Sequence, residues 1–156
     1  MRVINFKSDD EYMTPYMAWE NIIPFIPKQT PIWECFFGDG RSGQHLRDLG
    51  CTNVIHEKID FFTSDRGEVI VSNPPFSLKK QVFKRLHELQ KPYILLVPIQ
   101  TITKKYFTTY FKDKCQIIIP QKRIQFVKDG QQTSASWLDV IYLCYNMNLQ
   151  KDIIYL

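Results

Sequence analysis

The sequence EVIVSNPPF (residues 68–76) joins a short apolar run to two consecutive prolines. The β-branched residues at its start favour a buried strand. Pro74 and Pro75 have no backbone N–H, so neither can extend a sheet ladder. Residues 78–89 then place apolar side chains at helical spacing. A buried strand that ends on Asn73, two prolines and an aromatic residue indicates a binding site rather than an ordinary Asn-Pro turn.

Short apolar runs alternate with amphipathic runs along the chain. This alternation is typical of an α/β fold in which helices cover both faces of a mostly parallel sheet. In such sheets, ligands bind beyond the carboxyl ends of the strands. The predicted strands are residues 31–36, 53–56, 68–72, 92–97, 115–119 and 137–145, and the predicted helices are residues 41–49, 78–89 and 104–111.

The length and composition fit one compact domain, because 156 residues with 44% hydrophobic content can bury a core of their own. No apolar stretch is long enough to cross a bilayer, and the N-terminal residues lack the apolar region of a signal peptide. We therefore expect residues 1–156 to form one soluble, cytoplasmic domain with no membrane partner. The four cysteines are scattered singly, which favours buried reduced thiols over a metal site or a redox pair.

The net charge of +4 is mild, but the basic residues are unevenly distributed. Between Glu88 and Asp129 the only acidic residue is Asp113. A basic stretch that follows the two prolines suits a phosphate backbone passing the site, and solvated helix faces explain it about equally well. The basic residues are Lys79, Lys80, Lys84, Arg85, Lys91, Lys104, Lys105, Lys112, Lys114, Lys122, Arg123 and Lys128.

Residues 38–43 fit the pattern G-x-G-x-x-G between a predicted strand and a predicted helix. Glycines let a backbone approach a cofactor that contains adenosine, and Glu57 follows at the interval expected for an acid that binds ribose hydroxyls. Glu34 favours S-adenosylmethionine over a nicotinamide dinucleotide, because a carboxylate can hold the amino group of a methionine moiety but would repel a pyrophosphate. A tight turn without a ligand is the alternative.

Asp60 and the phenylalanines after it are a weaker signal. Asp60 can accept a hydrogen bond from the amino group of an adenine ring, with an apolar side chain against the ring. In the alternative, Phe61 and Phe62 belong to the core and Asp60 caps a turn, and these residues taken alone favour that alternative.

The residues after the strand suit a planar amine as the methyl acceptor. The side-chain oxygen of Asn73 and the carbonyl of Pro74 are two acceptors for the two N–H groups of an exocyclic amine. Pro75 restricts Pro74 to an extended conformation, so both oxygens point the same way. Phe76 supplies an apolar face on which a base can stack.

At these residues the sequence resembles the class I S-adenosylmethionine-dependent DNA N6-adenine methyltransferases, in particular small phage- and virus-type members related to restriction-modification enzymes. The resemblance covers nearly the whole chain. It implies a Rossmann-like, mostly parallel seven-stranded sheet with an antiparallel last strand. It also implies S-adenosyl-L-methionine as the cofactor, DNA as the partner and a target adenine that is flipped out of the duplex.

Together, the residue patterns and the resemblance predict three sets of site residues. The predicted catalytic residues are Asn73, Pro74, Pro75 and Phe76. The predicted cofactor-binding residues are Glu34, Phe36, Gly38, Gly40, Glu57, Asp60 and Phe61, and the resemblance alone adds Tyr12, Thr14 and Pro15, which look like the family's N-terminal cofactor-contacting motif. The predicted substrate-binding residues are Phe76 and, from the resemblance of residues 122–126 to the family's late motif, Phe126, Lys122 and Arg123.

The chain departs from larger relatives because no segment is long enough to form a separate target-recognition domain. Residues 127–136 are the candidate loop for reading neighbouring bases, so we expect loose selectivity or help from a second subunit, including a homodimer partner. An RNA adenine methyltransferase, a protein glutamine methyltransferase and a non-catalytic subunit are the rival readings. If the chain is of phage or viral origin, the expected location is the interior of the host cell.

Overall fold

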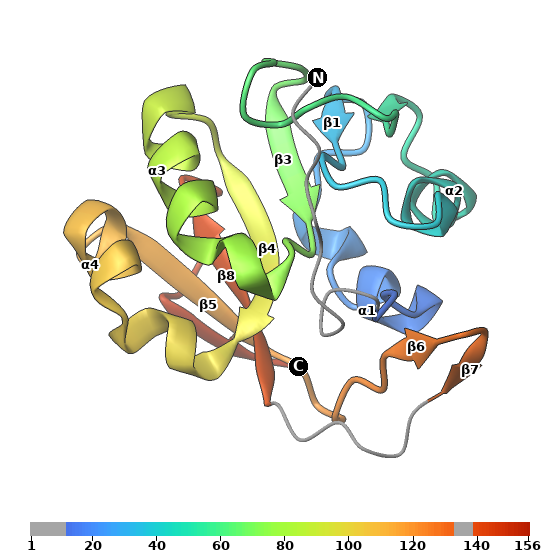
Figure 1. Ribbon diagram of the computed structural model, residues 1–156. Coiled ribbons are helices and arrows are strands. Elements are labelled where there is room, and N and C mark those ends of the chain that lie inside the picture. The colour runs from blue at the N-terminus through green and yellow to red at the C-terminus, as the bar shows by residue number, and fades with distance from the viewer. Residues whose placement is uncertain (1–11, 133–138) are drawn as a thin grey trace.

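The structure is a computed structural model that describes residues 12–132 and 139–156. Within these residues, seven strands form one sheet in the order β2-β1-β3-β4-β8-β5-β9 (Figure 1). The strands are β1 (Ile32–Trp33), β2 (Val54–Ile55), β3 (Val69–Ser72), β4 (Tyr93–Pro98), β5 (Cys115–Ile119), β8 (Val140–Tyr145) and β9 (Ile153–Tyr155). β1 and β2 are shorter than the strands predicted at residues 31–36 and 53–56.

Most neighbouring strands run parallel. β1 pairs in parallel with β2 and β3, β3 with β4, and β5 with β9, whereas β8 is antiparallel to both β4 and β5. This is the Rossmann-like, mostly parallel arrangement that the sequence predicts. The expected antiparallel last strand requires one correction: β8 is the antiparallel strand, but β9 follows it and runs parallel to β5 at the edge of the sheet.

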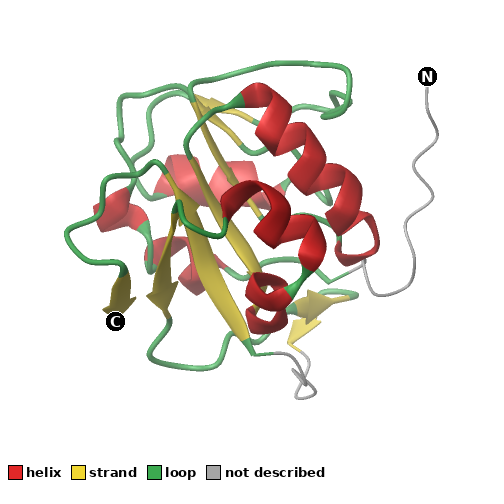
Figure 2. Cartoon of the chain, turned by 90° about the vertical axis from the view of Figure 1, so that its left-hand side faces the viewer, coloured by secondary structure: helices red, strands yellow, loops and turns green. Residues whose placement is uncertain are grey.

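Helices lie on both faces of the sheet, as predicted (Figure 2). They are α1 (Tyr16–Glu20), α2 (Arg41–Asp48), α3 (Lys79–Leu89) and α4 (Lys105–Phe111). Because side chains alternate along a strand, the sheet buries one cluster with Trp19 and Leu46 from α1 and α2, and another with Phe83 and Phe107 from α3 and α4. Three of the four cysteines are buried and all four are free thiols, as expected.

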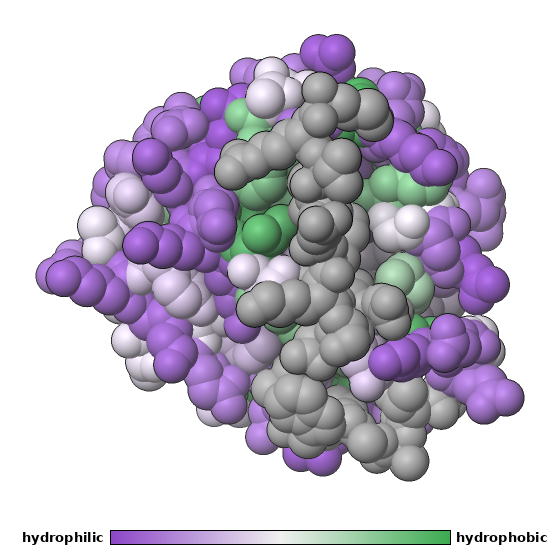
Figure 3. Space-filling view, viewed as in Figure 1, coloured by the Kyte–Doolittle hydropathy of each residue, from purple (hydrophilic) through white to green (hydrophobic). Residues whose placement is uncertain are grey.

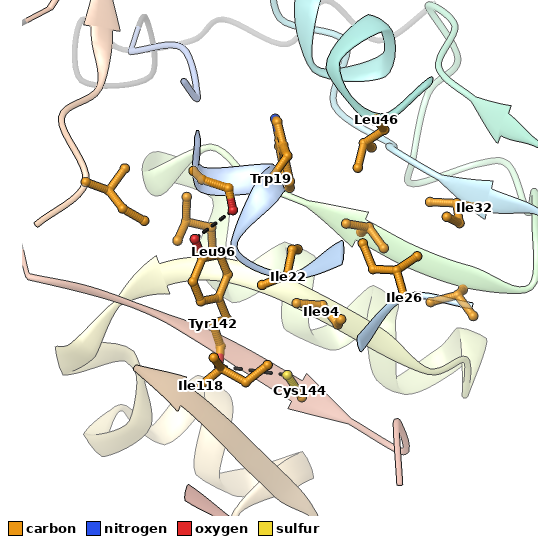
Figure 4. Packing of buried hydrophobic residues seen from close by; sticks show 14 of the residues in the cluster. Trp19, Ile22, Ile26, Ile32, Leu46, Ile94, Leu96, Ile118, Tyr142 and Cys144 are labelled. Atoms are coloured by element: carbon orange, nitrogen blue, oxygen red, sulfur yellow. Dashed lines mark hydrogen bonds between the residues drawn. The ribbon is translucent and has the colours of Figure 1, made fainter. Parts of the chain in front are cut away.

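Tyr142 fixes α1 against the middle of the sheet. Its hydroxyl donates to the Ala18 carbonyl at 2.7 Å (Figure 4). The Asn21 side-chain amide donates to the same hydroxyl at 3.1 Å. A buried phenol that is satisfied in this way stabilises one position of the helix. Residues 12–15, which lead into α1, are therefore held near the carboxyl end of β3.

A small hairpin lies outside the main sheet (Figure 1). It consists of β6 (Val127–Lys128) and β7 (Gln131–Gln132), joined by Asp129 and Gly130. Both turn residues have positive φ, 52° and 77°, which suits an Asp-Gly hairpin turn. The hairpin forms the first part of the loop that was predicted to read neighbouring bases, and residues 133–136 of that loop lie outside the described residues.

Among the described residues, no helix has both the length and the apolar character that a membrane span needs.

Candidate active site

The two prolines leave the sheet at the carboxyl end of β3, a central strand between β1 and β4. Pro74 and Pro75 are buried, and Pro75 is extended with φ −61° and ψ 130°. A short 3-10 helix, η3 (Phe76–Leu78), then leads into α3. The residues that cannot pair in a ladder thus lie just past its end, where a parallel sheet offers its binding edge.

Asn73 has one half of its amide held and the other half unpaired. The Nδ2 group donates to the Thr14 hydroxyl oxygen at 2.9 Å. The Oδ1 atom is buried and has no hydrogen-bond partner among the residues that the structure describes. An unsatisfied buried acceptor costs free energy and is rare in folded proteins, so its presence at a strand end indicates a place for a donor from a ligand.

Glu34 is a buried acid beside the same strand end. The Ser72 hydroxyl donates to Glu34 Oε1, and the Phe36 N–H donates to the same oxygen at 3.2 Å. Burial raises the pKa of Glu34 to about 8, although hydrogen bonds from Ser72, Phe36 and Ser42 act in the opposite direction. A carboxyl group with this pKa is mostly neutral at pH 7, and an arriving ammonium group would favour its ionised form.

Ser42 links this acid to α1. It lies in the first turn of α2 and accepts a hydrogen bond from the Trp19 indole at 3.2 Å. Glu34 is thereby contacted from the end of β3 and from the start of α2. The side chains of Ser42 and Ser72 did not figure in the sequence prediction, although a serine at the end of the apolar β3 run was a usable signal.

The glycine loop adopts backbone conformations that favour glycine. Gly38 and Gly40 have φ of 57° and 85°, in the left-handed region. A Cβ at Gly38 would lie 3.0 Å from the Met13 sulfur, and a Cβ at Gly40 would lie 3.0 Å from the ring of Phe37. The loop is thus packed beside the N-terminal segment that carries Thr14.

The third glycine of the pattern packs α2 against β2. A Cβ at Gly43 would lie 2.5 Å from the Cβ and the ring of His56. His56 Nδ1 lies 2.9 Å from the Glu34 carbonyl, so it carries the proton and donates to that oxygen. Burial lowers the pKa of His56, which keeps the ring neutral, and the ring stacks on Phe37 at 4.9 Å between centroids. His56 was not among the predicted site residues.

The acids and the phenylalanine predicted to bind the adenosine moiety follow β2 in the chain. Glu57 directly follows His56 after β2 and is exposed. Asp60 Oδ1 accepts a hydrogen bond from the Phe62 N–H at 2.9 Å. Asp60 therefore caps a turn, as in the alternative to adenine binding given for this residue. Phe61 is only 1% exposed, and its ring packs on Phe36 at 5.1 Å between centroids, so the ring is a core residue.

The N-terminal and late motifs meet through the backbone. Met13 and Val127 exchange two hydrogen bonds, of 2.6 Å and 2.9 Å. Thr14 and Pro15 are buried, Pro15 directly precedes α1 as predicted, and Tyr12 lies under the ammonium of Lys128 at 5.0 Å. Four segments therefore converge at the carboxyl ends of β1 and β3, and they are residues 12–15, 34–43, 72–76 and 126–128.

The predicted substrate contacts are placed unevenly. Phe126 is next to the Met13 pairing but only 6% exposed, so its ring belongs to the core in this state. Lys122 is exposed in the bend after β5. Arg123 is also exposed and donates to Asp139 at 2.9 Å. Phe76 is half-buried, with the ammonium of Lys79 5.0 Å from its ring centroid.

The surface around these segments is mixed in character. Hydrophilic residues cover α3 and α4, and hydrophobic surface shows mainly toward the middle of the face seen in Figure 3. Exposed lysines occur at the start of α3 and of α4, on the side of the sheet where β3 and β4 end, and they are Lys80, Lys104 and Lys105.

None of the family models and none of the curated proteins compared with this chain matches it. Among solved structures, the crystal structure of TrmN from Thermus thermophilus is similar, with a TM-score of 0.35 and 13% sequence identity. The match covers 83% of this chain and 40% of that chain, so this chain spans less than half the length of that protein. A likeness this distant supports no argument about function.

Proposed function

We propose that this protein transfers a methyl group from S-adenosyl-L-methionine to the exocyclic N6 of an adenine flipped out of DNA. The observation that carries the proposal is the buried, unpartnered Oδ1 of Asn73, which stands at the carboxyl end of a central strand. An acceptor oxygen that has no donor within the described residues is suited to a donor that a substrate brings.

Asn73 and Pro74 act on the nucleophile. The lone pair of an exocyclic amine is delocalised into the ring, so the amine is a poor nucleophile until its geometry changes. Two acceptors that hold its two N–H groups draw the nitrogen toward tetrahedral geometry and aim the lone pair at the methyl carbon. The buried prolines keep the two oxygens fixed, so little reorganisation is needed at the moment of reaction.

The residues around the glycine loop fit the proposed cofactor. Glu34 is a buried acid whose ionised form needs a cation, which matches the ammonium of a methionine moiety. Gly38 and Gly40 expose backbone at the start of α2, and Glu57 is an exposed carboxylate for ribose hydroxyls. When bound, the cofactor supplies a methyl group on a sulfonium. As the nitrogen–carbon bond forms, the carbon–sulfur bond breaks and the sulfur keeps the electron pair as a thioether. The nitrogen releases one proton to water.

The basic residues after the two prolines favour a nucleic acid as the substrate, and Phe76 supports the extruded base by stacking. Residues 1–156 act as one methyltransferase domain, and residues 127–132 are the described part of the loop that would read neighbouring bases. Selectivity through this short loop is loose, or a second subunit adds to it.

The test is incubation of the protein with labelled S-adenosylmethionine and matched DNA and RNA oligonucleotides, followed by digestion to nucleosides. We expect label in N6-methyladenine from DNA. Label in RNA alone would replace DNA by RNA as the substrate. Label in neither nucleic acid, with donor bound normally, would overturn the proposal.

The first variant for this assay is Asn73→Ala. It removes the unpartnered acceptor, so methyl transfer should fall by about a hundredfold or more while donor affinity changes little, as for loss of one preorganised group in an active site. The matched control is Asn53→Ala, an exposed asparagine before β2 at the opposite end of the sheet. Near-normal turnover of Asn73→Ala would show that Asn73 does not bind the acceptor.

A further inference from the structure

We propose that Thr14 is a positioning residue that keeps the Asn73 oxygen turned toward the methyl acceptor. This inference rests on the proposed function, because it concerns how the acceptor amide of that site is oriented. The structural basis is one contact between residues that are 59 positions apart in the chain: Asn73 Nδ2 donates to Thr14 Oγ1 at 2.9 Å.

A primary amide has two ends of almost the same shape and opposite hydrogen-bonding character. Rotation of the Asn73 side-chain amide by half a turn would exchange Oδ1 and Nδ2. The NH2 group would then face the N–H groups of the incoming amine, and two donors would meet. Methyl transfer therefore requires a contact that holds the NH2 end on the side away from the substrate.

Thr14 supplies that contact, and its own position is fixed. Because a hydroxyl can also donate, Thr14 acts by giving the NH2 end a partner in the productive orientation, while the incoming N–H groups disfavour the flipped orientation. Its side chain is only 6% exposed, and it lies between Met13, which pairs with Val127, and Pro15, which precedes α1. In the observed orientation the hydroxyl oxygen accepts from the NH2 group and Oδ1 is left for the substrate. A valine at position 14 would keep the shape of the side chain and remove the acceptor.

The first test measures the amide directly and needs no substrate. In nitrogen-15 spectra, the two side-chain amide protons of Asn73 are assigned by their loss in Asn73→Asp. We expect their exchange with solvent to become at least about tenfold faster in Thr14→Val and to stay within about twofold of wild type in Thr14→Ser, because one hydrogen bond is lost or kept. Unchanged exchange in Thr14→Val would overturn the proposal, whatever the protein methylates.

The second test separates positioning from cofactor binding, the role that the sequence predicts for Thr14. With saturating donor, Thr14→Val should lower kcat about tenfold and leave the Kd for S-adenosylmethionine within about twofold, while Thr14→Ser should recover most of kcat. The control is Thr63→Val, an exposed threonine. A raised Kd with an unchanged kcat would assign Thr14 to the cofactor and overturn the positioning role.

The third test uses the symmetry of a carboxylate. Both oxygens of Asp are acceptors, so the side chain of Asn73→Asp presents an acceptor to the amine in either orientation. If Thr14 acts by orienting the amide, Thr14→Val should cost kcat much less in the Asn73→Asp background than in wild type. An equal cost in both backgrounds would mean that Thr14 acts by another route. If Asn73→Asp is itself inactive, the exchange measurement decides.

If the wild-type protein methylates neither DNA nor RNA, the proposed function fails, and the exchange measurement still reports on the Thr14–Asn73 contact. If the wild type methylates adenine but Thr14→Val keeps the full kcat, only the positioning role fails.

Discussion

A half-buried asparagine and a buried glutamate at the ends of neighbouring strands define the site at the scale of single residues. Asn73 keeps an unpartnered oxygen and Glu34 keeps a carboxyl group that burial makes largely neutral at pH 7. Both features cost stability, since an unsatisfied acceptor and a desolvated acid each oppose folding. Residues that oppose folding are expected where a protein binds a partner for them.

Glu34 should make the stability of the fold depend on pH. The pKa of Glu34 is raised from 4.5 to about 8 in the folded state. The neutral acid is therefore compatible with the fold, and the free energy of unfolding is highest below pH 4.5 and falls as the pH rises through 8. Glu34→Gln should therefore gain stability relative to wild type between pH 4.5 and 8, by an amount on the order of 5 kcal/mol at most. The measurement is the free energy of unfolding from urea titrations across this range. Parallel pH profiles for the two proteins would contradict a raised pKa at Glu34.

Sequence reasoning at this scale identified residue types better than contacts. The amide and the two prolines after β3 stand out from any apolar run, and so does Glu34 before the glycines. The contact of Asn73 with Thr14 could not be predicted, because it depends on how α1 is fixed by Tyr142. His56 was missed because its ring is held by a main-chain carbonyl and by stacking, which leave no mark in the sequence.

At the scale of elements, the packing of α2 on β2 positions the glycine loop. Gly43 allows the helix to approach so closely that a Cβ would lie 2.5 Å from the Cβ of His56. This is the role expected of the third glycine in the G-x-G-x-x-G pattern. Close packing of α2 on the sheet therefore fixes the position of the loop between β1 and α2.

Gly43→Ala should destabilise the protein, although alanine favours a helix more than glycine does. The added methyl group overlaps a side chain that cannot move easily, and overpacking of this kind costs about 2 kcal/mol. The measurement is the midpoint of urea unfolding. Gln44→Ala, at the next and exposed position of α2, is the control and should change the free energy of unfolding by less than about 0.5 kcal/mol. Equal midpoints for both variants would argue against close packing at Gly43.

Elements with a strong periodic signal were predicted well, and the two-residue strands β1 and β2 also lie inside predicted strands, whereas three other short strands were missed. β5 coincides with the predicted strand at residues 115–119, and α3 and α4 each begin one residue after their predicted starts. The hairpin β6–β7 and the strand β9 were not predicted. Each of these strands has only two or three residues, so neither alternation nor propensity accumulates over enough positions to give a signal.

At the scale of the whole molecule, the distribution of charge matters more than the net charge of +4. The exposed lysines at the start of α3 and α4 lie near the strand ends that carry the site. Lysine near a phosphate backbone releases counterions on binding, so the affinity depends on salt.

The affinity for a duplex oligonucleotide should fall as salt rises, and Lys80→Ala with Lys104→Ala should make that dependence weaker. Loss of two phosphate contacts should reduce the slope of log K against log salt by roughly 2. Fluorescence anisotropy at several salt concentrations measures this slope. Lys112→Ala, at the other end of α4, is the control and should leave the slope unchanged. An unchanged slope in the double variant would remove these lysines from the proposed path of the nucleic acid.

The outer side of β9 has a consequence for handling the protein. β9 ends the strand order, so the main-chain groups on its far side have no partner strand among the described residues. Ile153 and Tyr155 are 52% and 76% exposed on the same strand. An exposed, apolar edge strand can pair with a strand of a second polypeptide and so extend the sheet. Because β9 has only three residues, such pairing is weak. Concentrated samples are thus expected to self-associate reversibly, with Tyr155→Lys as the simplest remedy.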